Sequence, residues 1–218
     1  MRLQRLPAQA LASQLIPNVD EGLREALKVP DHVKSLGLVT STSDDVGYTA
    51  IDEATKMAAV EVVYAKSFYA GAAHASGPLS GEFIGILGGA TPSEVKSGLE
   101  VAVRMINEGP AFYAVDEAGN HAYFAHTISR TGSFLSSLAG IETGESLAYL
   151  IAPPLEAMVG LDAALKATDV RICVFYGPPT ETNFGGGLLT GSQSSCKAAA
   201  EVFADTIQKI AQYPHKMF

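Results

Sequence analysis

The chain repeats one sequence pattern at a constant distance. Residues 52–62 read DEATKMAAVEV, and residues 162–172 read DAALKATDVRI. Asp52 and Asp162 lie 110 positions apart, which is about half of the 218 residues. Solenoid units recur at roughly 20–50 residues, so a repeat this long excludes a solenoid. It predicts instead that a small domain occurs twice.

The similarity extends over nearly the whole chain. Upstream of the repeated aspartate, residues 35–39 (SLGLV) match residues 146–150 (SLAYL). The copies are expected to divide at Gly109-Pro110, because glycine often follows a helix and proline interrupts one. We therefore predict one domain over residues 1–109 and a second over residues 110–218.

Each copy has the pattern of an α+β or α/β domain, and we predict the α+β class with a sandwich of sheet and helices. Thr91-Pro92-Ser93-Glu94 is typical of a helix start, with threonine as the cap and proline in the first turn. A shorter amphipathic helix is expected around Asp52, with Ala50, Ile51, Ala54 and Ala58 on its apolar side. Residues 60–64 and 170–176 are rich in β-branched and aromatic residues and predict strands. The expected order is strand, helix, strand, helix, strand, strand, helix, with one sheet and helices on one side.

The composition limits the class of protein. Hydrophobic residues make up 47% of the chain and charged residues 17%, so two small domains have surplus apolar surface that oligomerisation would bury. The net charge of −8 argues against nucleic acid as a main partner. No run of about 18 apolar residues predicts a membrane span, and the N-terminus does not resemble a signal peptide. Two cysteines are too few for a disulfide framework and fit a reducing compartment.

Catalytic patterns are lacking in the sequence. It contains no Walker A motif, no HExxH and no Cys-x-x-Cys, and its five histidines do not have ligand spacing, so we expect no metal, no cofactor and no enzyme. Gly185-Gly186-Gly187 does not form a dinucleotide fingerprint and predicts a flexible loop. Cys196 lies on an apolar helical stripe and is expected in the core. Asp44-Asp45, among serines and threonines, is either a solvated turn or a site for an ammonium or other cation.

Two glycine-bearing loops follow the repeated strands. They cover residues 69–78 and 177–187, and both are small-residue segments with little charge. They are either ordinary surface loops or segments that symmetry brings together around an axis.

Several blocks of residues resemble the shell domain of bacterial microcompartments. The pattern Asp-x-Ala-x-Lys-x-Ala-x-Val at residues 52–60 is the first of them, and two copies in tandem are similar to the trimeric, tandem-domain shell proteins. Further blocks resemble the ethanolamine-utilisation type of these proteins, over about residues 10–213. These are SDDV (43–46), VEVVY (60–64), YAGA (69–72), SRTGS (129–133), APPLEA (152–157), PPTETN (178–183) and LTGSQ (189–193).

The resemblance implies an architecture and a function. Each half would be a circularly permuted shell domain, and three chains would form a homotrimeric, pseudohexagonal tile. Tiles would pack edge to edge with other shell proteins around enzymes in the bacterial cytoplasm. The tile would carry a central pore that opens and closes and smaller pores that pass or bind ethanolamine, and it would not be an enzyme.

The resemblance also implies roles for particular residues. Lys56 and Lys166 match the lysine at the tile edge, and their alternative role is an i,i+4 ion pair with Asp52 and Asp162. The residues implied for the small pore and its ethanolamine contact are Asp45, Tyr69, Glu82, Phe112 and Thr182. Those implied for the central-pore loops are Gly71, His74, Gly77, Asn183, Phe184, Gly185 and Gly186.

Two other functions are compatible with the sequence. One is a shell trimer of another compartment, such as one that processes propanediol or choline. The other is a small-molecule-sensing oligomer unrelated to shells, with ligands at subunit clefts. Formation of flat protein sheets would favour a shell protein over a sensor.

Overall fold

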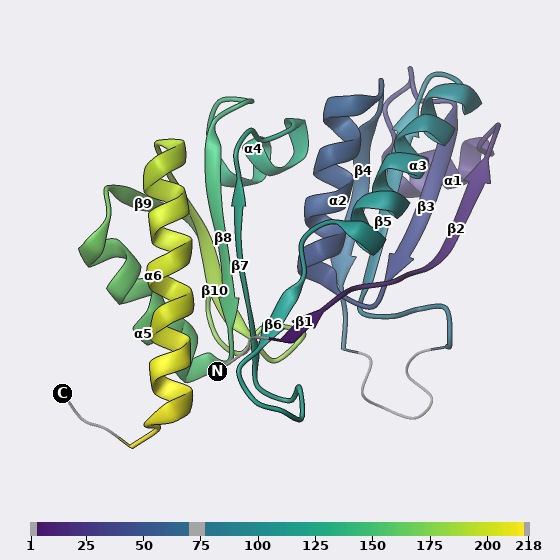
Figure 1. Ribbon diagram of the computed structural model, residues 1–218. Helices are drawn as coiled ribbons and strands as arrows, with labels where there is room; N and C mark the ends of the chain where they lie inside the picture. Colours follow the sequence, from purple (N-terminus) through teal and green to yellow (C-terminus); the bar gives the residue numbers. More distant parts are fainter. Residues whose placement is uncertain (1–3, 70–76, 216–218) are drawn as a thin grey trace. The chain divides into compact units, whose positions relative to one another are not determined.

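The computed structural model describes residues 4–69 and 77–215 (Figure 1). Within them the chain forms two compact units. The N-terminal unit contains residues 7–110 together with Gly132–Leu135, and the C-terminal unit contains the other described residues. The domain limits 1–109 and 110–218 remain a prediction.

The N-terminal unit is built on a four-stranded antiparallel sheet. Its strand order is β2-β3-β5-β4, and helices α2 and α3 pack against each other and against the sheet (Figure 1). The strands are β2 (Ala10–Ile16), β3 (Ser35–Ser41), β4 (Glu61–Ser67) and β5 (Phe83–Gly89), and the helices are α1 (Glu21–Leu27), α2 (Asp44–Met57) and α3 (Pro92–Glu108). Val33 belongs to a small apolar cluster with Leu36 of β3 and Ile86 of β5.

The C-terminal unit repeats this sheet and extends it. The order β7-β8-β10-β9 corresponds to β2-β3-β5-β4, and β6 and β1 add two short strands beyond β7. The strands are β1 (Gln4–Leu6), β6 (Phe112–Ala114), β7 (Ala122–Ile128), β8 (Ser146–Ala152), β9 (Val170–Tyr176) and β10 (Gly185–Gly191), and the helices are α4 (Ser133–Ala139), α5 (Pro154–Ala167) and α6 (Gln193–Gln212). The first residues of α4 belong to the N-terminal unit.

The predicted fold class and element order are confirmed. Both copies run strand, helix, strand, helix, strand, strand, helix. The repeat extends to individual hydrogen bonds, because the Ser35 hydroxyl donates to the Pro17 carbonyl at 2.6 Å and the Ser146 hydroxyl donates to the Ser129 carbonyl at 2.7 Å. The two copies therefore share local conformations as well as topology.

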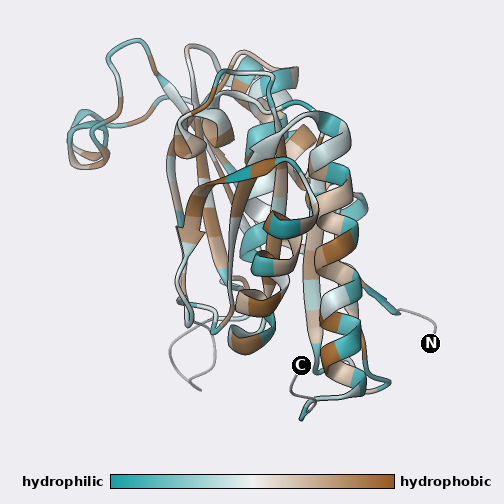
Figure 2. Cartoon of the chain, turned by 90° about the vertical axis from the view of Figure 1, so that its left-hand side faces the viewer, coloured by the Kyte–Doolittle hydropathy of each residue, from teal (hydrophilic) through white to brown (hydrophobic). Residues whose placement is uncertain are grey.

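Hydrophobic and hydrophilic residues alternate along the helices (Figure 2). In α6, Cys196, Phe203 and Ile207 are completely buried and belong to the core that includes Leu150 of β8. The prediction that Cys196 is a core residue is confirmed.

The helix around Asp52 begins earlier than predicted. Helix α2 starts at Asp44, and the Ser43 hydroxyl caps it by accepting a hydrogen bond from the Val46 amide. Asp44-Asp45 is thus not a solvated turn: both side chains lie in the first helical turn, and both are buried. The serine and threonine residues that suggested a turn include the N-cap of a helix.

The glycine run at residues 185–187 is a strand and not the flexible loop that was predicted. These glycines pair with Ala152, Ile151 and Leu150 of β8. Gly186 has φ of 151°, and a Cβ atom there would lie 1.9 Å from the Leu150 carbonyl oxygen. Glycine is required because the neighbouring backbone approaches so closely.

Candidate functional site

An acidic cluster lies at the start of α2 in the N-terminal unit. Asp44 and Asp45 are only 8% and 5% exposed. Burial, and then the negative charge of Asp44, raise the pKa of the half-buried Glu82 carboxyl. Mutual repulsion among carboxylates is relieved by a bound cation, so this cluster has the charge that an ammonium group requires.

Tyr48 belongs to the same cluster, although the sequence analysis did not select it. Its hydroxyl lies 2.9 Å from the Ser67 hydroxyl, and its ring meets Phe83 edge to face at 5.0 Å. Burial, opposed by the hydrogen bond to Ser67, raises the pKa of the Tyr48 phenol, and Asp44 and Asp45 raise it further. The correct helix start would have revealed Tyr48, because residues three or four apart share one helix face.

Tyr69 follows β4 and is 58% exposed. The amide of Phe68, its neighbour, donates to the Glu82 carbonyl at 3.1 Å, which ties this end of the loop to the residue before β5. Gly77, at the other end of the loop, is exposed. Gly71 and His74, which were also predicted in a central-pore loop, lie outside the described residues.

The other predicted site residues lie in the C-terminal unit. Phe112 of β6 packs against Phe124 at 5.3 Å and meets Phe184 edge to face at 5.7 Å. Phe184 ends a tight turn, because its carbonyl accepts from the Thr180 amide at 2.8 Å and Asn183 adopts φ of 67°. The Thr182 hydroxyl, in the same turn, lies 3.3 Å from the Thr180 hydroxyl.

The structure thus groups the predicted residues by unit. Asp45, Tyr69 and Glu82 belong to the N-terminal unit, whereas Phe112 and Thr182 belong to the C-terminal unit. Gly185 and Gly186, predicted in a loop, are the first residues of β10, so Asn183 and Phe184 are the loop residues that precede this strand.

The two repeated lysines form different ion pairs. Lys166 pairs with Asp162 at 2.6 Å, which is the alternative role named for it above. The same alternative does not apply to Lys56, because Lys56 forms its ion pair with Glu53 and not with Asp52. The reason lies in Asp52, which is 1% exposed and uses its carboxylate elsewhere.

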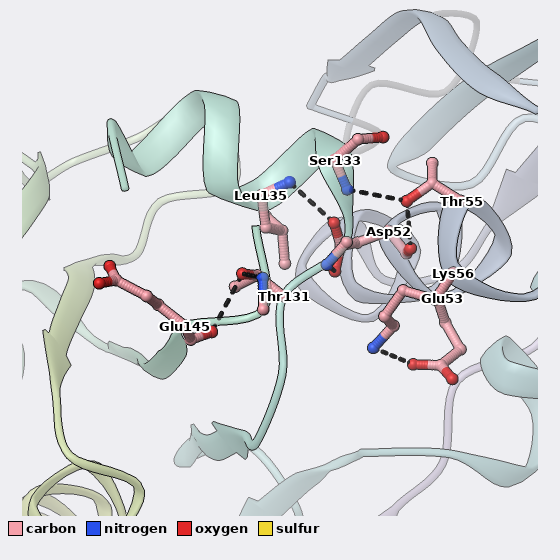
Figure 3. A network of polar contacts seen from close by, with 10 residues as sticks. Asp52, Glu53, Thr55, Lys56, Thr131, Ser133, Leu135 and Glu145 are labelled. Atoms are coloured by element: carbon pink, nitrogen blue, oxygen red, sulfur yellow. Dashed lines mark hydrogen bonds and ion pairs between the residues drawn. The ribbon is translucent and has the colours of Figure 1, made fainter. Parts of the chain in front are cut away.

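Asp52 binds the backbone at the start of α4 (Figure 3). Its carboxylate accepts hydrogen bonds from the Gly132 amide at 2.7 Å and the Leu135 amide at 2.8 Å. The Thr55 hydroxyl accepts from the Ser133 amide at 3.1 Å. Gly132 has no side chain to cap α4, so residues of α2 supply acceptors for these first-turn amides.

The start of α4 lies so close to α2 that residue 132 has to be glycine. A Cβ atom at Gly132 would lie 2.3 Å from the Thr55 hydroxyl oxygen. Burial raises the pKa of the Asp52 carboxyl, and the hydrogen bonds from the Leu135 and Gly132 amides partly offset this rise. The sequence showed Asp52 only as a repeated residue and gave no sign of its partners 80 and 83 positions away.

Residues 4–69 and 77–215 contain no group of three or more His, Cys, Asp or Glu side chains that could hold a metal ion. Within the same ranges, no helix combines the length and the apolar character needed to cross a membrane.

Comparisons with known proteins agree on one family. The family described as BMC domain matches residues 35–117. The bacterial microcompartment shell protein EutL of Clostridium perfringens is 54% identical over 98% of this chain and 99% of that protein. The crystal structure of the ethanolamine utilization protein EutL from Leptotrichia buccalis is 58% identical, with a TM-score of 0.96 over all of both chains. A trimeric bacterial microcompartment shell protein PduB shares the fold at 20% identity, with a TM-score of 0.78 over 94% of this chain and 89% of that one.

Proposed function

Because the chain belongs to the EutL type of bacterial microcompartment shell protein, we propose that it forms a gated tile in the shell of an ethanolamine-utilising compartment. It is a structural protein of the microcompartment shell and not an enzyme. In this proposal three copies form a pseudohexagonal homotrimer, and tiles pack edge to edge with other shell proteins.

The internal repeat supports the tile. Two domains with the same topology in each chain give six similar domains in a trimer, which suits a hexagonal outline. Lys56 and Lys166 occupy equivalent positions near the ends of α2 and α5, so we propose that both face neighbouring tiles.

We further propose that the acidic cluster of the N-terminal unit contacts ethanolamine. The observations that carry this proposal are the burial of Asp44 and Asp45 in the first turn of α2 and the raised pKa of the half-buried Glu82 carboxyl, which burial and the charge of Asp44 cause and which favours a cation. Asp45 would bind the ammonium group by a charge-assisted hydrogen bond. Thr182 and the Phe112 carbonyl stay predicted contacts for the ligand, and Tyr69 and Glu82 stay predicted lining residues of the small pore.

A calorimetric titration of the purified protein tests this assignment. We expect ethanolamine to bind, and ethylene glycol, which lacks the ammonium group, to bind at least tenfold more weakly. Asp45→Asn should weaken ethanolamine to a similar extent, whereas Glu201→Ala, which removes an exposed carboxylate elsewhere, should bind like the wild type. Equal binding of both compounds, or unchanged binding by Asp45→Asn, would refute the role of Asp45.

The loop before β10 is a candidate for the central-pore gate. Its Phe184 ring packs on Phe112, an interaction between two half-buried aromatic side chains that can be broken at small cost. We propose that Asn183 and Phe184 form the movable part of the pore and that Gly185 and Gly186 anchor it in the sheet, while Gly77 stays a predicted residue of a central-pore loop.

A further inference from the structure

The strand that follows each repeated lysine begins with a different charge. In the N-terminal unit, α2 ends one residue after Lys56, and Glu61 is the first residue of β4. In the C-terminal unit, α5 ends one residue after Lys166, and Arg171 is the second residue of β9. Both strands have a bulge at the same point of the repeat, two positions after Glu61 and two after Arg171, so these two residues are equivalent.

A second position at this end of the sheet also changes sign. Lys34 corresponds to Glu145, because the carbonyls of both residues accept hydrogen bonds from equivalent amides, at 3.0 and 2.9 Å. Lys34 and Glu61 lie on either side of the end of β5. Lys34, Glu145 and Arg171 are exposed, and Glu61 is partly exposed. The same edge of the two units therefore has opposite charges at two equivalent positions.

The edge of the C-terminal unit is hollow where that of the N-terminal unit is filled. Val33, just before Lys34, is completely buried and packs against Gly88 of β5. The equivalent residue is Gly144, and a Cβ atom there would have no other atom within 4 Å. A cavity of about 550 Å³ opens at this place. Its lining includes Gly144, Glu145, Asp169, Arg171 and Ser192.

The edge of the N-terminal unit carries a polar projection instead. The connection between α1 and β3 is one residue longer than that between α4 and β8. On it, His32 Nε2 lies 2.7 Å from Glu61 Oε1, and the two side chains are 68% and 41% exposed. The cavity offers the opposite charges, since its two carboxylates suit an imidazolium and the Arg171 guanidinium suits a carboxylate. That guanidinium lies 3.5 Å from the Cys173 sulfur, a weak acceptor that a carboxylate would displace.

The symmetry of the proposed tile brings these two edges together. In a trimer of two-domain chains, the edges of N-terminal and C-terminal units alternate around the hexagonal outline, so opposite edges always belong to different units. Tiles that repeat by translation meet through opposite edges. Every contact in such a sheet therefore joins an N-terminal unit of one tile to a C-terminal unit of the next.

We propose that the His32–Glu61 pair of one tile enters the cavity of the C-terminal unit of a second copy of this chain in the neighbouring tile. The Glu61 carboxylate pairs with the Arg171 guanidinium, and the His32 imidazole lies beside the Glu145 and Asp169 carboxylates. The inference rests on the proposed shell function and gives the contact between tiles a direction, because each contact joins two unlike edges. A tile of this chain thus distinguishes its own two kinds of edge by charge and by shape.

Charge reversal at one edge tests this pairing by sheet formation at low ionic strength. Sedimentation and electron microscopy give the lowest protein concentration at which flat sheets form. Glu61→Arg and Arg171→Glu should each raise this concentration at least about tenfold, because like charges then face each other across every contact. Both variants should keep the mass of the wild-type trimer. Glu201→Arg, a reversal on the exposed side of α6, is the matched control and should assemble like the wild type.

Two rescue experiments identify the partner. The double variant Glu61→Arg/Arg171→Glu restores opposite charges and should assemble close to the wild-type concentration. An equal mixture of the two single variants should form sheets that contain both, because positions 61 and 171 are both positive in one variant and both negative in the other. The pairing is wrong while the shell function stands if both single variants assemble like the control, if either loses the trimer, or if neither rescue assembles. A wild type that forms no sheets would overturn the inference together with the proposed tile.

Discussion

The hydrogen bonds that Asp52 makes to the start of α4 allow a quantitative test by substitution. Asp52→Ala removes the acceptor of two amides at 2.7 and 2.8 Å, in a place where Asp52 is 1% exposed. A buried donor left without a partner costs about 1–3 kcal/mol, so two cost roughly 2–6 kcal/mol. Relief from burying a carboxylate offsets part of this loss. We therefore expect Asp52→Ala to lower the free energy of unfolding by about 3 kcal/mol.

Urea unfolding at one protein concentration measures this difference. For a chain of this length, about 3 kcal/mol corresponds to a decrease in Tm of roughly 6–12 °C. Asp52→Asn keeps one acceptor oxygen but turns an NH2 group toward the other amide, so its cost should lie between those of the wild type and Asp52→Ala. Glu201→Ala is the control, because it removes a carboxylate from an exposed ion pair and should cost no more than about 0.5 kcal/mol.

If Asp52→Ala unfolds within about 0.5 kcal/mol of the wild type, as an exposed aspartate would, the carboxylate does not hold the start of α4.

Two further predictions concern a strand and a titration. Gly186→Ala should cost more than about 3 kcal/mol, because its Cβ would lie 1.9 Å from the Leu150 carbonyl oxygen, whereas Gly140→Ala, at φ of 63° with no atom within 4 Å, should cost only about 1 kcal/mol. A similar loss in both variants would contradict this account. Burial and Asp44 raise the pKa of Glu82, so the folded state holds its proton to a higher pH than the unfolded state does. The free energy of unfolding should therefore fall as the pH rises from the ordinary glutamate pKa through the raised pKa of Glu82. Glu82→Gln should flatten this part of a plot of urea midpoint against pH. An unchanged slope in the variant would refute the role of Glu82.

The internal repeat made the element order predictable. Each strand and helix of the N-terminal copy had a counterpart in the C-terminal copy, so a weak pattern such as that of residues 60–64 was supported by residues 170–176. The order and the α+β class could be predicted because hydrophobic periodicity and helix caps are local signals.

What the sequence did not reveal depends on distant contacts or on close backbone approach. Ser43 could cap a helix or begin a turn, and only the structure shows that Asp44 starts α2. Gly185–Gly187 carry no side chains, so their strand leaves no alternating pattern in the sequence. Asp52 and its equivalent Asp162 look alike in sequence, and they differ only because one of them meets Gly132. The ligand residues in the two units were implied by family resemblance, and their roles remain for calorimetry to test.

The path of the chain between the two units has a consequence for biosynthesis. The N-terminal unit needs Gly132–Leu135, and β1 pairs with β6, which lies more than 100 residues later in the chain. Ribosomes add about 5–20 residues per second, so the cover of Asp52 is synthesised on the order of 1–5 seconds after Pro110. Until then the nascent unit exposes the Asp52 carboxylate to water and lacks the Leu135 side chain, which is completely buried in the folded protein. A gene cut between the two repeats would encode two fragments, and each fragment would lack a segment of its own unit. Neither half of the gene therefore encodes a complete domain.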